Sequence, residues 1–533
     1  MKRRLLSLLI MCFLFSGCDA VEQIYDLINR QAEIESETVG ETVAPPVKAQ
    51  EGGEILNGNA LNLSMRFPMT LNPVTNEDVT IDRILKLVFE PLFALDDKQR
   101  PVSNLVDRYY PVSDGRGVLL KLRDDIYWDD GTPISTFDVS FTIDEIYKSP
   151  NSLYYDDILN IYDYSRIDNK EIRLVFNGHA AASLYALCFP IIPEHYYRGR
   201  MDADDSRSFK PVGSGAYKFG AYKASAGLEL IAVNAGIAGG PLIENINVVI
   251  SSDIETDTHA FEQGVTDIIT GDSAGHGKHS GKKDVGVYAY ASTYFDFIGF
   301  NYENELLNDP KLRAAIARCV DKEYIVEGIY QNFAFIAETP INPASWLFNP
   351  DARALPGDLT EAALLFEWYA FPEGFDGFKI IINAENDERV KIAGLLCDNL
   401  KNAGVESYVE AYQFGAFVEA IENGDFDIAV AGAHLSIRPD YNFLFKTGEN
   451  MFFYADEAMD ALLNEMETAA NEDEYLKAAH GLQKRITDET IMIGLCFRKH
   501  ALLTDKKIGG NIVPTIGNPF YTIDEWRINS ERK

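Results

Sequence analysis

The string Gly271-Asp272-Ser273-Ala274-Gly275 has the G-x-S-x-G spacing of a hydrolase nucleophile, and His276 follows it directly. A serine in such a string can attack acyl groups when a strand precedes it and a helix follows it. Residues 277–283 instead combine two glycines with three lysines, which predicts a charged loop. We therefore interpret the protein as non-enzymatic and keep a secreted serine hydrolase as the alternative.

Side chains that could bind a metal are scattered along the chain. His276 and His279 lie three residues apart with a glycine between them, and no cysteine is near. The six cysteines never form a C-x-x-C spacing, and four of them lie in apolar surroundings that favour buried free thiols. We predict no metal site, no cofactor and free thiols at Cys188, Cys319, Cys397 and Cys496.

Composition and charge exclude several classes of function. The chain has 533 residues, of which 46% are hydrophobic, so it can form a large core and several compact units. Its formal charge of −34 repels phosphate backbones, so nucleic acid is excluded as a partner. The sequence has no P-loop lysine pattern and no dinucleotide glycine fingerprint, so any use of ATP belongs to a separate subunit.

The first residues predict export and a lipid anchor. Three basic residues precede the apolar run Leu5–Phe15, which is too short to span a bilayer, and Ser16-Gly17-Cys18 follows. This ending resembles a bacterial lipobox, although its usual aliphatic position is a phenylalanine here. We predict a lipoprotein signal peptide over residues 1–17, a lipid on Cys18 and an acidic tether over residues 18–56. An ordinary secretory peptide or an uncleaved anchor is the alternative.

The body of the chain mixes two kinds of periodicity. Short apolar runs bounded by turn residues predict strands, and longer runs with helical spacing predict helices. The expected strands are residues 119–122, 172–176, 228–233, 246–250, 380–382 and 428–431. The expected helices are residues 133–147, with Thr132 as the cap, and 310–320, 389–403, 456–466 and 473–486. The sequence therefore predicts an α/β protein.

Seven strings occur in an order that is informative as a whole. They are TLNP at residues 70–73, VFEPLF at 88–93, LRDDIYWDDGTP at 122–133, PVGSGAY at 211–217, FEQGVTD at 261–267, LRAAIA at 312–317 and GDFD at 424–427. In this order they resemble the family 5 extracellular solute-binding proteins of ABC importers, which include oligopeptide, dipeptide and nickel receptors.

The resemblance implies a two-lobed, periplasmic-binding-protein-like fold of class II, whose first lobe is enlarged by an extra subdomain. We expect lobe I over residues 57–295, lobe II over 296–495 and a return to lobe I over 496–533. The chain is expected to cross between the lobes near residues 292–301 and 493–504. Such lobes close around a ligand.

The resemblance also implies a ligand site. In peptide-binding members an acidic residue after a second-lobe strand holds the amino terminus of the ligand, because a buried ammonium needs a charge partner. Ser436 stands at that position here, and Asp440 replaces it only if the loop is realigned. Peptide, N-blocked, cationic and non-peptide ligands therefore all stay open. Further expected ligand contacts are Thr70, Tyr294, Phe295, Trp346, His434 and Arg438.

Each of these contacts has a structural alternative. His434 and Arg438 could instead be surface or structural residues, and Tyr294 and Phe295 could simply pack a strand into the core. Taken together, the sequence predicts a lipid-anchored, monomeric receptor outside the cytoplasm, on the cell surface or in the periplasm. It would capture a small, peptide-like solute for a membrane ABC permease. A receptor for a metal chelate or a sugar, or one that signals to a sensor, would share the fold.

Overall fold

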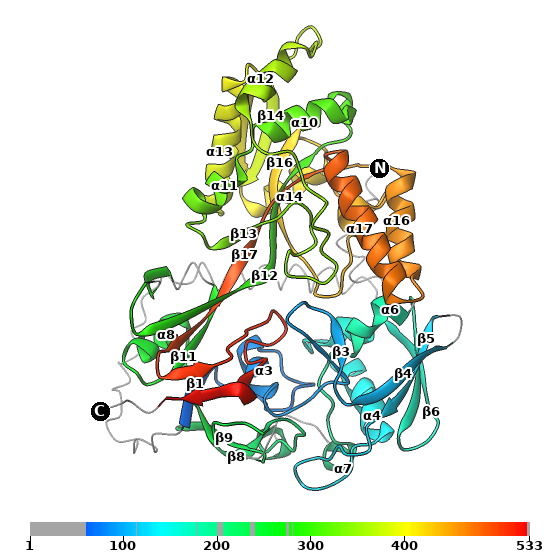
Figure 1. Cartoon of the computed structure of the whole chain (residues 1–533), viewed down its shortest axis with the longest axis vertical. Helices are drawn as coiled ribbons and strands as arrows, with labels where there is room; N and C mark the ends of the chain where they lie inside the picture. The colour runs from blue at the N-terminus through cyan, green and yellow to red at the C-terminus, as the bar shows by residue number, and fades with distance from the viewer. Residues whose placement is uncertain are drawn as a thin grey trace.

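The computed structural model describes residues 60–112, 115–178, 180–199, 206–234, 240–272, 277–279 and 281–529. The predicted signal peptide, Cys18 and the whole tether lie outside these residues, and so does Ser273. Figure 1 shows two lobes, one above the other, joined by β12 (Val285–Phe300) and β17 (Ile493–Asp505). Within the described ranges, no helix has both the length and the apolar character needed to cross a membrane.

The lower lobe, lobe I, contains two four-stranded sheets around one core. The first sheet has the order β1-β10-β9-β8, and the second, the extra subdomain, has the order β4-β5-β7-β6. Leu61, Leu120 and Leu230 from both sheets are fully buried in the same hydrophobic cluster, so the subdomain packs directly onto the lobe. The strands are β1 (Ala60–Met65), β4 (Val106–Val112), β5 (Gly117–Leu122), β6 (Ile161–Arg166), β7 (Glu171–Phe176), β8 (Tyr217–Lys223), β9 (Gly227–Ala232) and β10 (Asn245–Ile250).

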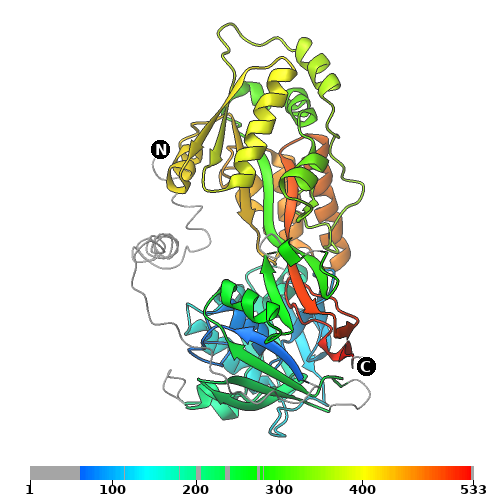
Figure 2. The same cartoon turned by 90° about the vertical axis from the view of Figure 1, so that its left-hand side faces the viewer.

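The upper lobe, lobe II, is built on a sheet that continues into lobe I. Its order is β11-β17-β12-β16-β14-β15, with β13 paired to β17. Figure 2 shows β12 and β17 passing side by side from one lobe to the other, as their antiparallel pairing requires. The remaining strands are β11 (Ile268–Asp272), β13 (Ala334–Ile336), β14 (Phe378–Asn383), β15 (Ser407–Tyr412) and β16 (Ile428–His434).

Helices cover this sheet in the upper lobe. Apolar residues of α10, α12 and α13 bury one cluster against it, and those of α14, α16 and α17 bury another. Each of the two long helices α13 and α17 has an asparagine cap and acidic residues in its first turn, which stabilises its N-terminus. The helices are α10 (Pro310–Arg318), α12 (Leu359–Glu367), α13 (Asp387–Asn402), α14 (Phe414–Glu422), α16 (Glu457–Thr468) and α17 (Glu472–Asp488).

One predicted helix start is wrong. The helix α4 (Thr136–Tyr147) begins three residues after Pro133, and its cap is Ser135 rather than Thr132. Ser135 and Asp138 form a capping box, in which the Ser135 backbone N–H donates to the Asp138 carboxylate over 2.8 Å. The Thr132 carbonyl instead accepts the Trp128 N–H over 2.9 Å, so Thr132 closes the preceding turn.

The end of the chain returns to the lower lobe. Strands β18 (Ile508–Gly510) and β19 (Trp526–Ile528) pair with each other, and Trp526 is fully buried in the core of lobe I. Cys188, Cys319, Cys397 and Cys496 are free, and Cys319 and Cys496 are buried. The exact lobe boundaries at residues 295 and 495 stay predictions, because β12 and β17 run through the waist without a break.

Candidate ligand-binding site

The loop that follows β16, residues 435–441, lies between two cavities. We call the first the hinge pocket because two of its residues, Ser292 and Thr293, belong to the connecting strand β12. It has a volume of about 30 Å³. Its lining is Gln99, Tyr185, Ser292, Thr293, Pro340, Asn342, Ser345, Leu435, Ser436, Ile437, Pro439, Tyr441, Phe497 and Ile516.

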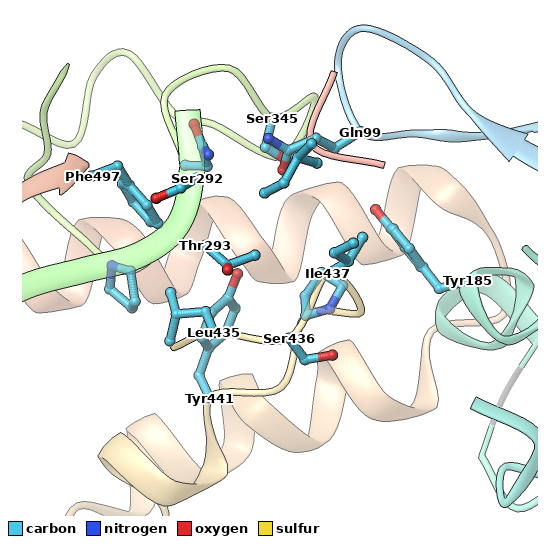
Figure 3. A pocket seen from close by; sticks show the side chains of 14 residues that line it. Gln99, Tyr185, Ser292, Thr293, Ser345, Leu435, Ser436, Ile437, Tyr441 and Phe497 are labelled. Atoms are coloured by element: carbon cyan, nitrogen blue, oxygen red, sulfur yellow. The ribbon is translucent and has the colours of Figure 1, made fainter. Parts of the chain in front are cut away.

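Both lobes and the connecting strands contribute to the hinge pocket. Gln99 comes from the turn between β2 (Phe93–Leu95) and β3 (Pro101–Ser103), where it has a positive φ of 62°. Tyr185 belongs to the short 3-10 helix Leu184–Leu187 of the lower lobe. Figure 3 shows Tyr185 entering from the lower lobe, while Leu435 and Ser436 approach along the loop. The hinge pocket is therefore placed where relative movement of the lobes would change it.

The second cavity, the outer pocket, has a volume of about 160 Å³ and shares Pro439 and Tyr441 with the hinge pocket. It carries charged side chains, namely those of Arg438, Asp440 and Glu467. Its lining is Asn160, Asn177, Gly178, Ser183, Arg438, Pro439, Asp440, Tyr441, Asn442, Leu463, Met466, Glu467 and Tyr475. The same loop thus presents neutral residues on one side and charged residues on the other.

Arg438 faces carboxylates of the lower lobe. Burial raises the pKa of Asp157 to about 6, and the positive charge of Arg438 partly opposes that rise. The pKa of the neighbouring Asp156 is also raised by burial and lowered in part by Arg438. Both aspartates belong to the short helix Tyr155–Ile158. The charge of Arg438 in the upper lobe therefore acts on carboxylates of the lower lobe.

Trp346 joins the two lobes beside the hinge pocket. Its indole N–H donates to the Tyr185 hydroxyl over 2.9 Å, and its backbone N–H donates to the Lys98 carbonyl over 2.8 Å. The Arg100 guanidinium lies 5.5 Å from the centre of the Trp346 ring and also forms an ion pair with Glu472 of α17. These contacts hold the turn between β2 and β3 against the upper lobe.

Comparison with known proteins agrees with this architecture. The family model described as bacterial extracellular solute-binding proteins, family 5 Middle, matches residues 100–450. The chain belongs to this family. The oligopeptide-binding protein AppA of Bacillus subtilis (strain 168) is 22% identical over 514 residues, which cover 90% of this chain and 92% of AppA.

Solved structures share the fold of this solute-binding protein. The nickel ABC transporter structure from Bacillus halodurans has a TM-score of 0.76 at 18% identity. The match covers 88% of this chain and 99% of the Bacillus halodurans chain. The structure of AppA from Bacillus subtilis in complex with a nonapeptide has a TM-score of 0.56 at 20% identity, and covers 89% and 99%. The predicted two-lobed α/β fold is confirmed by this similarity.

In this solute-binding protein, the predicted contacts fall into three groups. Ser436 lines the hinge pocket, and Arg438 and Asp440 line the outer pocket. Trp346 lines neither cavity but bonds to Tyr185, which lines the hinge pocket. Thr70 is buried and accepts the Asn72 N–H over 3.0 Å away from both cavities, so its ligand contact stays a prediction.

Phe295 packs into the core, and its ligand contact stays a prediction. Its side chain is fully buried, and its ring packs against those of Phe297 and Phe497 at centroid distances of 5.4 and 5.1 Å. Successive residues of a strand point to opposite faces, so the exposed Tyr294 and the buried Phe295 cannot both face solvent. The alternative, core packing, accounts for Phe295.

Tyr294 and His434 form an aromatic pair on the connecting sheet. They lie opposite each other on β12 and β16, and their ring centres are 4.8 Å apart in an edge-to-face arrangement. The His434 Nε2 is 2.7 Å from the Thr293 hydroxyl oxygen, and burial lowers the pKa of His434. Both residues stay candidates for ligand contact, because they lie next to a lining residue of the hinge pocket.

The sequence analysis missed a buried charge cluster under the same sheet. The Asp296 carboxylate is fully buried and accepts hydrogen bonds from Arg389, Arg498 and the Tyr330 hydroxyl, at 2.6 to 2.8 Å for the closest atoms. Burial alone would raise the pKa of Asp296, but the two guanidinium groups outweigh burial and lower it. This cluster ties β12 and β17 to the N-terminus of α13.

Proposed function

We propose that this protein captures a peptide-like solute at the seam between its lobes and delivers it to an ABC permease in the membrane. It performs no chemistry on the solute. A lipid on Cys18 holds it outside the cytoplasm, and residues 18–56 act as the tether. The observation that carries the proposal is that one loop, residues 435–441, separates two cavities whose walls come from both lobes.

The connection between the lobes suggests how binding of a solute would change the shape of the protein. A ligand that touches both lobes stabilises the closed arrangement only by the difference between its affinities for the closed and open forms. Because β12 and β17 connect the lobes side by side, a rotation at these strands would change both cavities together. A permease could then distinguish the loaded protein from the empty one.

The relatives favour a peptide-like ligand. One is named as an oligopeptide-binding protein, and its solved structure contains a nonapeptide. A metal chelate is the second candidate, because one of the similar structures is that of a nickel ABC transporter. A sugar receptor or a sensor-linked receptor of the same fold would use the same seam.

The decisive experiment identifies the bound solute. The protein is purified from cells, denatured, and the released small molecules are analysed by mass spectrometry. We expect peptides or peptide derivatives in amounts close to that of the protein. Release of a metal chelate or a sugar would instead replace the peptide as the proposed ligand. Conversion of a captured compound into a product would contradict the proposal that the protein performs no chemistry.

A further inference from the structure

The hinge pocket has an unusual lining for a site that holds the end of a peptide. Of the fourteen described residues that form it, eight carry neutral hydroxyl or amide groups and six are apolar. None of them is an aspartate, glutamate, lysine, arginine or histidine. A site for a free amino terminus needs a carboxylate, because a buried ammonium without a counter-charge loses several kcal/mol of hydration.

The groups that could still acquire a charge stay neutral. Burial raises the pKa of both lining tyrosines, Tyr185 and Tyr441, well above its ordinary value, so neither forms a phenolate near neutral pH. Burial lowers the pKa of His434, which contacts the lining residue Thr293, so its imidazole is uncharged as well. The hinge pocket therefore offers only uncharged hydrogen-bonding groups.

The charged side chains of the loop, Arg438 and Asp440, line the outer pocket and not the hinge pocket. Arg438 interacts with Asp156 and Asp157 of the lower lobe, on the side of the outer pocket. Arg100, next to Gln99 in the chain, forms an ion pair with Glu472. A charged ligand group in the hinge pocket would therefore find no opposite charge among the described residues that line it.

We propose that the hinge pocket selects the uncharged end of its solute, as in a peptide whose amino terminus is acylated or otherwise blocked. This inference rests on the proposed function, since it assumes a peptide-like ligand. An acyl amide presents one N–H donor and carbonyl acceptors, which hydroxyl and carboxamide side chains can satisfy without any counter-charge. The apolar lining residues, such as Leu435 and Phe497, suit the acyl group.

The test uses two matched libraries of tetrapeptides, one with free amino termini and one N-acetylated. Each is equilibrated with the purified full chain at neutral pH, and the retained peptides are quantified by mass spectrometry. We expect the acetylated form of a retained sequence to bind about tenfold more tightly than its free form. Free peptides that bind as well as acetylated ones overturn the inference but not the proposed function. Retention of neither library contradicts the proposed function itself.

A pair of variants checks that charge at one position decides the preference. Ser436→Asp supplies a carboxylate in the lining and is expected to shift the preference toward free amino termini by about tenfold. Ser436→Asn has nearly the same size without a charge, and it is expected to keep the preference for acetylated peptides. If both variants change the preference alike, the neutral lining is not the cause, and the inference fails.

Discussion

Trp346 donates its indole N–H to the hydroxyl of Tyr185 over 2.9 Å, so a residue of the upper lobe fixes a wall of the hinge pocket that comes from the lower lobe. The side chain of Tyr185 is buried and packs in a cluster composed largely of residues of the upper lobe. The hydrogen bond therefore couples the position of the two lobes to the shape of the pocket.

Trp346→Phe removes the indole N–H and keeps an aromatic ring. We expect solute affinity to fall about fivefold, because a hydrogen bond of this kind contributes about 1 kcal/mol. Calorimetric titration with the solute identified by mass spectrometry measures the change. Trp368→Phe, at a tryptophan that is 87% exposed, is the control and should leave affinity unaltered. Equal effects of the two substitutions would argue against the coupling.

Asp296→Asn removes the negative charge that Arg389 and Arg498 share. We expect the free energy of unfolding to fall by about 2 to 4 kcal/mol, because two partly buried guanidinium groups lose their counter-charge. Urea denaturation at pH 7 measures the loss, and Asp97→Asn, at an exposed carboxylate in the turn before β3, is the control. A variant as stable as the parent would show that the cluster does not stabilise the waist.

The same carboxylate predicts a dependence on pH. The pKa of Asp296 is lower in the folded protein than its ordinary value, so its stabilising contribution is complete above the unfolded pKa of about 4. That contribution is lost as the pH falls through the lower, folded pKa. Denaturation curves of the parent protein should therefore lose stability in acid more steeply than those of Asp296→Asn. Parallel pH profiles would contradict this assignment.

Local patterns predicted the elements but not the contacts between distant residues. The helix expected over residues 389–403 is observed as α13 (Asp387–Asn402), because its apolar spacing and its asparagine cap are local signals. The two arginine partners of Asp296, in contrast, lie 93 and 202 residues away, and nothing in the string FDFIGF indicates them. Gln99 reaches the hinge pocket from a turn, and a turn has no apolar periodicity from which this position could be predicted.

Cys18→Ser removes the predicted lipid site. We expect the protein to move from the membrane fraction to the soluble fraction after cell lysis, because the acyl chains supply the anchor. Ultracentrifugation followed by immunoblotting measures the distribution, and Cys188→Ser, which changes a free thiol of the folded body, is the matched control. A Cys18→Ser protein that stays tightly bound to membranes would refute the lipid anchor and favour an uncleaved apolar segment.

Asp157→Asn tests whether the carboxylates at the outer pocket oppose folding near neutral pH. Burial raises the pKa of Asp157 to about 6 although Arg438 partly offsets the rise, so the folded protein binds this proton more tightly than the unfolded chain. The stability contributed by the protonated form is present below the unfolded pKa of about 4 and decreases as the pH rises to about 6. Asparagine cannot ionise, so the variant should exceed the parent by about 1 to 3 kcal/mol at pH 7 and match it near pH 4. Urea denaturation at both pH values measures the difference, and Asp97→Asn is again the control. A variant less stable than the parent at pH 7 would mean that the attraction to Arg438 outweighs the burial of Asp157.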